Sequence, residues 1–402
     1  MKAVIAIDSF KGSMTSLQAG EAAKNGILRV FPESETVVCP LADGGEGTVE
    51  ALTLGMGGEL QSVMVKGPLG VLVNAVYGIV ERETKTAIME IAQAAGITLL
   101  PKEKLNPLIT TTFGVGEMIL DAIEKGCRNF IIGIGGSATN DGGAGMLQAL
   151  GFEMCDKDGN EISLGAVGLK DLELIGKEHV IPELRECQFQ IACDVTNPLC
   201  GPQGCSAVYG PQKGADAEMI RQMDAWLSNY AGIALSFKEE RKAEDASVNL
   251  VNVGVDASFP GAGAAGGLGF AFRVFMNAEL QSGIQIVLRE TELEEKVKDA
   301  DYVITGEGRL DGQTVMGKAP IGVAEIAKKY GKPVLAFSGC VAEDAGVCNE
   351  YGIDAFFSIL CNAGTIAEVS ECEQATWNMT TTVEQIFRLI KTTVGEEKRR
   401  TV

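Results

Sequence analysis

Residues 2 to 45 read KAVIAIDSFKGSMTSLQAGEAAKNGILRVFPESETVVCPLADGG. The apolar run at 2–10 predicts a buried strand, and the apolar residues of 16–31 recur with helical spacing. Residues 34–45 predict a second strand that runs into a loop. Strand, helix and strand in this succession predict the first part of a doubly wound α/β sheet.

The same alternation of helix and strand patterns returns only near residue 290, and the strand patterns after Lys66 follow a different rhythm. The first segment by itself has too few strands for a stable open sheet. We therefore expect a Rossmann-like doubly wound domain formed by residues 1–66 plus 288–402. A second α/β domain, residues 67–287, would be inserted into it.

Length and composition agree with two globular domains. The 402 residues are 46% hydrophobic and 22% charged, and no run of 18 uncharged apolar residues offers a membrane span. The first residues do not fit a signal peptide, and the eleven cysteines follow neither a disulfide-rich nor a zinc-binding spacing. We expect a cytoplasmic protein with reduced thiols and no membrane partner.

Charge and histidine content limit the chemistry. The formal net charge of -20 at pH 7 would repel a nucleic-acid backbone, so we expect no nucleic-acid partner. A few local lysines can still attract a small anionic substrate into a cleft. The single histidine, His179, lies in a charged stretch without glycines, which favours a surface or capping role over catalysis.

The first candidate loop is DSFKGS at 8–13, directly after the first predicted strand. Ligands of open parallel sheets bind at the carboxyl ends of strands, so Asp8 could hold a metal or a hydroxyl and Lys11 could face an anion. The alternative is that this segment only caps the following helix. The residues that could form such an N-cap are Ser13, Thr15 and Ser16.

The second candidate loop is DGGEGT at 43–48, which ends the second predicted strand. An Asp-Gly turn is an ordinary feature of proteins. A plain turn, however, needs neither the second acid, Glu46, nor three glycines. Asp43 is therefore interpreted as a functional residue.

The richest signal is GIGGSATNDGGAG at 133–145, between an apolar strand pattern and an apolar helix pattern. Backbone amides of a glycine-rich turn before a helix form an anion site. The segment is not a Walker A motif and matches GxGxxG only loosely. Tight packing with an N-cap at Asp141 is the alternative. The candidate residues for binding are Gly135, Gly136, Ser137, Thr139, Asn140 and Asp141.

Three further loops carry weaker signals. Asp194 in CDVTNPL and Lys213 in GPQKGA could meet a substrate, although an Asx turn explains the first loop equally well. The segment GAGAAGGLG at 261–269 contains no acid or base, which by itself favours close packing or an entry loop.

Acid, base and glycine are packed together at 304–320, ITGEGRLDGQTVMGKAP, after a buried strand pattern. Glu307 and Asp311 are candidate metal ligands or a general base. Lys318 precedes a helix that Pro320 can open at its first position. A solvated loop is the alternative, but ligand sites favour such strand ends.

Taken together, these loops resemble the type I glycerate kinase family, sometimes called the glycerate 2-kinases, from residue 1 to about 375. The resemblance implies a Rossmann-like domain with an inserted domain and a kinase that depends on ATP and Mg²⁺. It implies phosphorylation of D-glycerate, commonly to 2-phosphoglycerate, in organic (sugar) acid catabolism. The matching motifs are DSFKGS, PLADGGEGT, GIGGSATNDGG, CDVTNPL, GPQKGA, GAAGGLG and ITGEGRLDGQTVMGKAPIGVA.

The implied chemistry can be placed on these motifs as a hypothesis. The glycine-rich loop at 135–145 would hold ATP phosphates together with Gly266 and Gly267. Lys11 and Lys318 would neutralise charge, and Asp194 or Asp8 would accept the proton of the attacking hydroxyl. The candidate Mg²⁺ ligands are Asp43, Glu307 and Asp311, with Asp43 also counted as catalytic.

Other functions stay open at this point. A kinase that forms 3-phosphoglycerate, a non-catalytic sugar-acid-binding protein and a hydroxy-acid dehydrogenase are the alternatives. The dehydrogenase would need a clear GxGxxG with a later acid, and a sensor would not need so many carboxylates. A homodimer is equally open.

Overall fold

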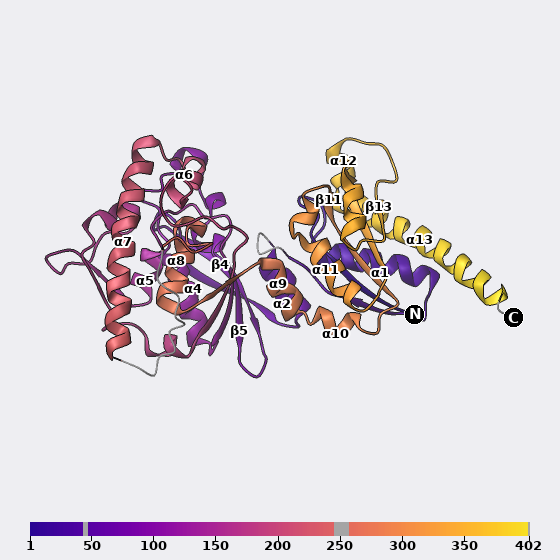
Figure 1. Ribbon diagram of the computed structural model, residues 1–402, viewed down its shortest axis with the longest axis horizontal. Helices are drawn as coiled ribbons and strands as arrows, with labels where there is room; N and C mark the ends of the chain where they lie inside the picture. Colours follow the sequence, from indigo (N-terminus) through magenta and orange to yellow (C-terminus); the bar gives the residue numbers. More distant parts are fainter. Residues whose placement is uncertain (43–46, 245–256, 401–402) are drawn as a thin grey trace. The chain divides into compact units, whose positions relative to one another are not determined.

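The chain divides into two compact units (Figure 1). The computed structural model describes the backbone of residues 1–42, 47–244 and 257–400, and the side chains of these residues except 238–244, 366 and 394–400. Both units are α/β, as predicted. Unit 1 consists of Met1–Asp43, Leu54–Gly57 and Ile284–Val402, and unit 2 of Gly44–Thr53 and Gly58–Gly283.

Unit 1 contains a parallel sheet with helices on both faces. Its strands are β1 (Lys2–Ile7), β2 (Glu35–Val38), β11 (Tyr302–Leu310), β12 (Val334–Val341) and β13 (Ala355–Ser358). Its helices are α1 (Ser16–Val30), α10 (Leu293–Val297), α11 (Ala319–Lys329), α12 (Ile366–Ser370), α13 (Cys372–Arg400), η7 (Thr314–Met316) and η8 (Ala345–Tyr351). Helices α2 (Thr48–Gly55) and α9 (Gly283–Glu290) cross the division between the units.

Unit 2 contains a mixed sheet, a small hairpin and the longest described loops. Its strands are β3 (Glu59–Lys66), β4 (Leu72–Val80), β5 (Thr86–Glu90), β6 (Asn129–Gly133), β7 (Glu153–Cys155), β8 (Leu174–Gly176), β9 (Gln188–Ala192) and β10 (Glu279–Gln281). Its α-helices are α3 (Ala92–Ala95), α4 (Phe113–Glu124), α5 (Ala144–Ala149), α6 (Cys205–Tyr209), α7 (Ala217–Glu244) and α8 (Leu268–Met276). Its 3₁₀ helices are η1 (Ile97–Leu99), η2 (Lys102–Lys104), η3 (Ala166–Asp171), η4 (Pro182–Glu186), η5 (Pro211–Lys213) and η6 (Ala264–Gly266).

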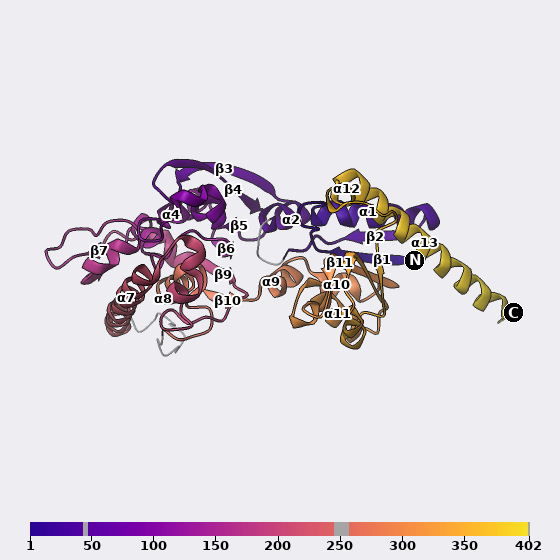
Figure 2. The same ribbon diagram turned by 90° about the horizontal axis from the view of Figure 1, so that it is seen from above.

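The sheet of unit 1 has the order β13-β12-β11-β1-β2, and every pair is parallel. Counted within this unit, the order is 2-1-3-4-5, a doubly wound arrangement whose direction of progression reverses between β1 and β11. Figure 2 shows α1 and α13 on one face of this sheet and α10 and α11 on the other. The predicted doubly wound domain is therefore present.

Alternation along β1 explains how both faces become covered. Ala3, Ile5 and Ile7 belong to the core cluster that includes α1 and α13. The intervening residues Val4 and Ala6 are equally buried, so the strand is apolar from Ala3 to Ile7, as expected for a central parallel strand. Helix α1 begins at a capping box in which Thr15 and Gln18 bond each other's backbone amides.

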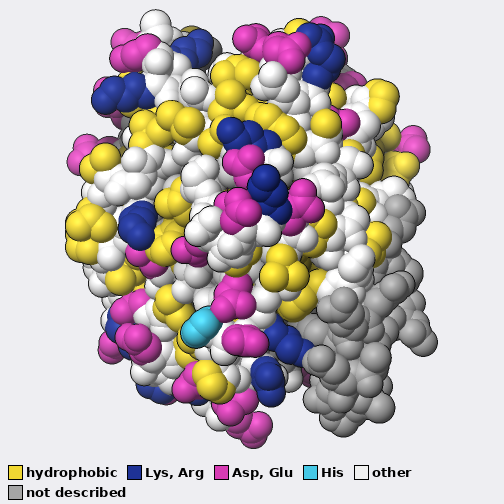
Figure 3. Space-filling model, turned by 90° about the vertical axis from the view of Figure 1, so that its left-hand side faces the viewer, with side chains coloured by type: hydrophobic (Ala, Val, Ile, Leu, Met, Phe, Trp, Pro, Cys, Tyr) yellow, Lys and Arg dark blue, Asp and Glu magenta, His cyan; other side chains and the backbone are white. Residues whose placement is uncertain are grey.

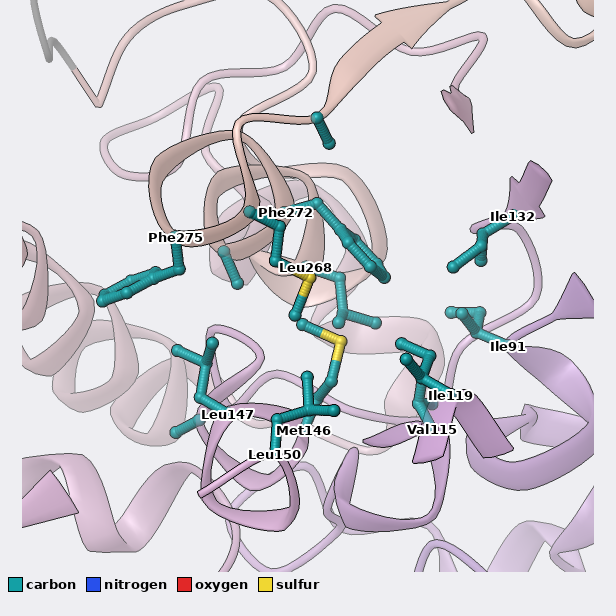
Figure 4. Close-up of a cluster of buried hydrophobic side chains, with 14 of the residues drawn as sticks. Ile91, Val115, Ile119, Ile132, Met146, Leu147, Leu150, Leu268, Phe272 and Phe275 are labelled. Carbon is teal, nitrogen blue, oxygen red and sulfur yellow. The ribbon is translucent and has the colours of Figure 1, made fainter. Parts of the chain in front are cut away.

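The main sheet of unit 2 has the order β10-β9-β6-β5-β4-β3, in which β10, β9, β6 and β5 are parallel. Strands β4 and β3 continue it as an antiparallel hairpin. Figure 4 shows the core against this sheet, with Val115 and Ile119 of α4, Met146 of α5 and Phe272 of α8 packed together.

The observed division differs from the predicted domain boundary at Lys66. Residues 59–66 form β3, which pairs with β4 along its whole length and so belongs to the sheet of unit 2. The helix predicted over 47–60 ends at Gly55 for the same reason, because its last residues start this strand.

Three further expectations concern the whole chain. No helix in the described part is long and apolar enough to cross a membrane. All eleven cysteines are free thiols. Acidic and basic side chains are interspersed on the face drawn in Figure 3, where the side chain of His179 faces solvent. His179 pairs with Glu153 at 2.6 Å, a surface role as expected.

Candidate functional site

The reversal point of the unit 1 sheet lies between β1 and β11, and the segments that leave these two strands carry charged residues. Strand β1 runs directly beside β11, with Ile7 opposite Gly306. The amide of Asp8 donates to the carbonyl of Gly306 at 2.9 Å. Ligands of such sheets bind beyond the carboxyl ends of the strands at the reversal point. The fold therefore brings the segment 8–13 beside the segment around Glu307.

Glu307 and Asp311 both lie close to one cation. The Nζ of Lys318 is 3.6 Å from Glu307 Oε2 and 3.6 Å from Asp311 Oδ1. Thr314 Oγ1 donates to Glu307 Oε1 at 2.6 Å, and Arg309 Nε lies 3.0 Å from Asp311 Oδ2. Two carboxylates thus converge at one point, where they can share a cation.

The two carboxyl groups differ in how their environment affects ionisation. Burial raises the pKa of Glu307 above the ordinary glutamate range, against the hydrogen bond from Thr314 and the charge of Lys318. Partial burial would also raise the pKa of Asp311. The hydrogen bond from the Gln313 amide and the charges of Lys318 and Arg309 outweigh this effect and lower the pKa of Asp311.

The sequence assigned Glu307 to a loop, which was wrong. Strand β11 continues to Leu310 and pairs with β12 up to Val341. Glu307 therefore projects from a paired strand, and Ser338 Oγ of the neighbouring β12 also donates to its carbonyl at 2.8 Å. A rigid strand positions a ligand more precisely than a loop does.

Asp8 and Lys11 occupy the segment between β1 and α1. Asp8 is half-buried and its Oδ1 accepts from the Ser9 amide at 2.7 Å, whereas Lys11 is exposed. The expected alternative, an N-cap, is also present, but Thr15 provides it. Ser16 instead links two strand ends, donating to Ile7 O and accepting from the Leu41 amide. Asp8 and Lys11 are therefore not needed to cap the helix.

The glycine-rich loop of unit 2 follows β6 and is held by hydrogen bonds from neighbouring segments. The Ile97 amide donates to Gly136 O, and the Ala138 amide donates to Ala95 O, both at 2.8 Å. Thr110 Oγ1 donates to Ala138 O at 2.9 Å. Two of these bonds occupy carbonyl groups of the loop, and the third uses the amide of Ala138. Neighbouring segments thus hold the loop backbone from Gly136 to Ala138.

The amides at the start of this loop are available. No described residue accepts a hydrogen bond from the backbone amides of Gly135, Gly136 or Ser137. Gly135 and Gly136 are exposed, and Ser137 is 7% exposed. Gly136 has φ +71°, a conformation that favours glycine. Consecutive free amides of this kind can bind an anion.

The later residues of the same loop are fully buried. Asp141 accepts from the amide and hydroxyl of Thr112 at 2.8 and 2.9 Å and from the amides of Gly143 and Gly145. Burial raises its pKa against these hydrogen bonds. Asn140 donates to Ser206 Oγ at 2.8 Å. The expectation that Asp141 touches a ligand is thus not supported by its position, because its carboxylate is committed to protein donors.

The start of α5 is consequently not the anion site that the sequence suggested. Asp141 already bonds the amides of its first turn, and the helix has only six residues. The alternative of an N-cap at Asp141 is two residues off, because the N-cap of α5 is Gly143, although the Asp141 side chain does accept from the amides of Gly143 and Gly145. Thr139 is fully buried, and no described group bonds its hydroxyl. Thr139, Asn140 and Asp141 shape the loop, whereas Gly135, Gly136 and Ser137 are the ones that can meet a ligand.

Gly266 and Gly267 pack against this loop. A Cβ at Gly266 would lie 2.1 Å from Thr139 O, and one at Gly267 would lie 2.7 Å from Gly142 Cα. Gly266 O accepts from the Gly142 amide at 2.9 Å. The sequence suggested close packing for this segment by itself, and its glycines allow that close approach of two backbones.

Asp194 follows β9, the strand next to β6. Gly133 lies opposite Ala192 in this pair, so Asp194 and Gly135 follow neighbouring strands. Asp194 is exposed, and its Oδ1 accepts from the Gly283 amide at 3.1 Å. The predicted convergence of strand ends therefore holds within unit 2.

Two buried charged residues near these loops were only weakly indicated as site residues by the sequence, or not at all. Lys213, buried beneath the glycine-rich loop, donates to Ser137 Oγ at 2.8 Å and to Thr139 O at 2.6 Å. Glu90 ends β5, is 6% exposed and accepts from the Val49 amide at 3.0 Å. An acid inside the apolar run TAIMEIA was the only signal for Glu90. Asp43 lies outside the described residues.

The site loops, now placed at the strand ends of both units, can be compared with known proteins. The model of the Glycerate kinase family matches residues 3–391. The chain belongs to the glycerate kinase family. The Glycerate 2-kinase of Escherichia coli strain K12 is 49% identical over 368 residues, which cover 92% of this chain and 93% of that protein. A Glycerate kinase of Haemophilus influenzae is 45% identical over 97% of this chain and 99% of its own length.

A solved structure agrees with this relationship. It comes from Salmonella typhimurium LT2 and carries the provisional description glycerate kinase 2. It matches with a TM-score of 0.87 and 42% identity, over 98% of this chain and 99% of that one. The chain is therefore a kinase enzyme, and its family supplies the expectation of a phosphate donor.

The residues of unit 1 fit the metal that kinases use. Mg²⁺ is commonly bound through one or two carboxylates plus substrate phosphates. Glu307 and Asp311 supply two such carboxylates, and both already face the ammonium of Lys318. No group of three or more metal-binding side chains occurs among the described residues.

Proposed function

We propose that this kinase transfers the γ-phosphate of ATP to D-glycerate with the help of Mg²⁺, forming 2-phosphoglycerate in organic acid catabolism. The observation that carries the proposal is the convergence of Glu307 and Asp311 on Lys318 beside the reversal point of the sheet. It occurs in a chain whose relatives are named glycerate kinases. The E. coli name, Glycerate 2-kinase, favours the 2-position.

The charged residues of unit 1 would balance phosphate charge. Phosphoryl transfer depends mainly on positioning and on neutralising the charge of the transferred group. Glu307 and Asp311 would hold Mg²⁺, which when bound neutralises phosphate oxygens. Lys318 and Lys11 would add positive charge on the protein side. Lys318 is 40% exposed and therefore accessible to a ligand.

The residues of unit 2 would bind oxyanions and accept a proton. Gly135, Gly136 and Ser137 offer donors that have no acceptor within the described part of the chain, which suits phosphate or carboxylate oxygens. Asp194 or Asp8 would accept the proton of the attacking glycerate hydroxyl. We also infer a cytoplasmic location, which the free thiols support.

The test is the product formed from ATP, Mg²⁺ and D-glycerate, observed by phosphorus NMR. Phosphorus on the 2-hydroxyl couples to the single proton at C2, and phosphorus on the 3-hydroxyl couples to two protons at C3. We expect the first pattern. The second pattern would support the kinase that forms 3-phosphoglycerate. Glycerate binding without any phosphate ester would contradict the proposed reaction.

A further inference from the structure

Unit 2 contains a buried cation to which the proposed reaction assigns no role. Lys213 is 2% exposed and ends η5. The next residue, Gly214, has φ +93°, and a Cβ there would lie 2.4 Å from Leu105 O. The backbone around Lys213 is thus tightly constrained. Burying an ammonium without a close carboxylate is unfavourable, so its presence calls for a function.

The ammonium of Lys213 determines the direction of one hydrogen bond. A protonated Nζ can only donate hydrogen bonds, so Ser137 Oγ must be the acceptor in the 2.8 Å hydrogen bond between the two side chains. The Ser137 hydroxyl proton then has to point elsewhere. None of the described residues accepts it. Ser137 is therefore held as a donor whose acceptor is not among the residues that the structure describes.

The Ser137 hydroxyl lies close in the chain to other hydrogen-bond donors. The amides of Gly135, Gly136 and Ser137 also have no acceptor among the residues that the structure describes. A second bond from Lys213, to Thr139 O at 2.6 Å, holds the loop on the far side of Ser137. The loop thus presents several hydrogen-bond donors on consecutive residues, which suits an oxyanion.

We propose that Lys213 is a positioning residue that keeps the Ser137 hydroxyl turned as a donor toward an oxyanion of a substrate, without touching the substrate itself. The inference rests on the proposed function, because the oxyanion would be an ATP phosphate or the glycerate carboxylate. Both present the same chemistry to the loop. The experiment below separates them.

The mechanism predicts a dependence on pH. Burial lowers the pKa of Lys213 to about 8, although the nearby Cys205 and Asp141 raise it. Above that pH the nitrogen gains a lone pair and can accept the Ser137 proton. The hydroxyl then turns inward, and the oxyanion loses one donor. Affinity for the oxyanion should therefore fall as the pH rises from 7 to 9.

The test is calorimetric binding of two probes, D-glycerate and a non-hydrolysable ATP analogue with Mg²⁺, to four forms of the full chain. These are the natural protein, Lys213→Met, Ser137→Ala and the double variant. One probe should bind about tenfold more weakly to each single variant, the scale of one hydrogen bond to a charged group. That probe identifies the oxyanion. The double variant should bind it no more weakly than Ser137→Ala.

Two results would overturn the inference. If Lys213→Met weakens binding by the same factor with and without Ser137, the lysine does not act through that hydroxyl. If the binding affinities of the natural protein and of Ser137→Ala change equally between pH 7 and 9, the Ser137 hydroxyl does not change its hydrogen-bond direction with pH. This second comparison leaves Lys213 unchanged and so remains decisive even where Lys213→Met does not fold.

The outcome also separates this inference from the proposed function. Binding of both probes by the natural protein, with no coupling between Lys213 and Ser137, contradicts only the role of Lys213. Binding of neither probe contradicts the proposed function and, with it, this inference.

Discussion

Glu307 and Asp311 show how strongly the surroundings of an individual residue affect its ionisation. Both face Lys318 at 3.6 Å, but burial raises the pKa of Glu307, whereas hydrogen bonding and nearby charges lower that of Asp311. A strand and a bonded turn hold them, so neither needs a large rearrangement to bind a cation.

Replacing Glu307 with Gln should raise the Mg²⁺ concentration for half-maximal activity at least about tenfold, because an amide oxygen is a weaker ligand than a carboxylate. The measurement is the initial rate over a Mg²⁺ titration. Glu343→Gln, an exposed acid of the same unit, is the matched control and should leave the titration unchanged. An unchanged Mg²⁺ requirement in Glu307→Gln would exclude this residue as a ligand.

The general base is the second question at this scale. Replacing the true base, Asp194 or Asp8, with Asn should lower kcat about 100-fold, the usual size of acid-base contributions. The other variant should lose less. Asp158→Asn, an exposed aspartate in a surface turn, is the control. Full activity in both Asp194→Asn and Asp8→Asn would rule out this assignment.

At the scale of elements, the packing of α1 on α13 closes one face of the unit 1 sheet. Gly26 is the point of closest approach, because a Cβ there would lie 2.6 Å from Thr380 O and 2.9 Å from Val383 Cβ. Thr380 Oγ1 also donates to Ala22 O at 3.0 Å. A segment near the start of the chain is thus fastened to one near its end.

Gly26→Ala should lower the free energy of unfolding by about 1–3 kcal/mol, because the added methyl group overpacks this contact. The matched control is Gly232→Ala in α7, where no atom lies within 4 Å of the new Cβ. That change should stabilise by about 0.5–1 kcal/mol through helix propensity. Urea unfolding of the three proteins measures both effects, and equal changes in both variants would refute the packing argument.

At the scale of the whole molecule, the sheet of unit 1 is built from two distant segments of the chain. Strand β1 lies between β2 and β11, so the first segment supplies one edge of a sheet that the last segment completes. The continuous segment 44–283, in contrast, contains all the strands of unit 2.

A fragment of residues 1–57 should therefore be unfolded on its own, because two strands and their helices cannot bury enough surface. The fragment 44–283 is the control and should show a cooperative thermal transition. Far-UV circular dichroism with heating measures both. Cooperative folding of 1–57 alone would mean that the sheet does not need its second segment.

Much of the fold could be predicted from local pattern. The alternation in residues 2 to 38 indicated β1, α1 and β2, and the late return of the pattern indicated that the same sheet is resumed. Residues 61–66 were predicted as a strand, but residues 59–66 were assigned to the wrong domain, because a strand that joins an antiparallel hairpin can be placed in its sheet only with its partner, β4. Glu307 was placed in a loop because its glycine neighbours are typical of turns, whereas pairing with β12 extends the strand.

The sequence predicted which loops carry the candidate site, but it predicted the roles of their individual residues less well. Six residues of the glycine-rich loop were expected to bind a ligand, but Thr139, Asn140 and Asp141 are fully buried. Sequence spacing cannot tell which side chains of a loop point inward, since that depends on Thr112, Ser206 and other distant partners.

By itself, the sequence determined the α/β class, the resumed sheet and the family, because these depend on hydrophobic periodicity and on motifs that are contiguous in the chain. Only the tertiary structure decided that Lys213 lies under Ser137, 76 positions away, and that Asp141 serves the loop instead of a ligand. The physical reason is that burial and hydrogen-bond direction are set by groups that meet only after folding.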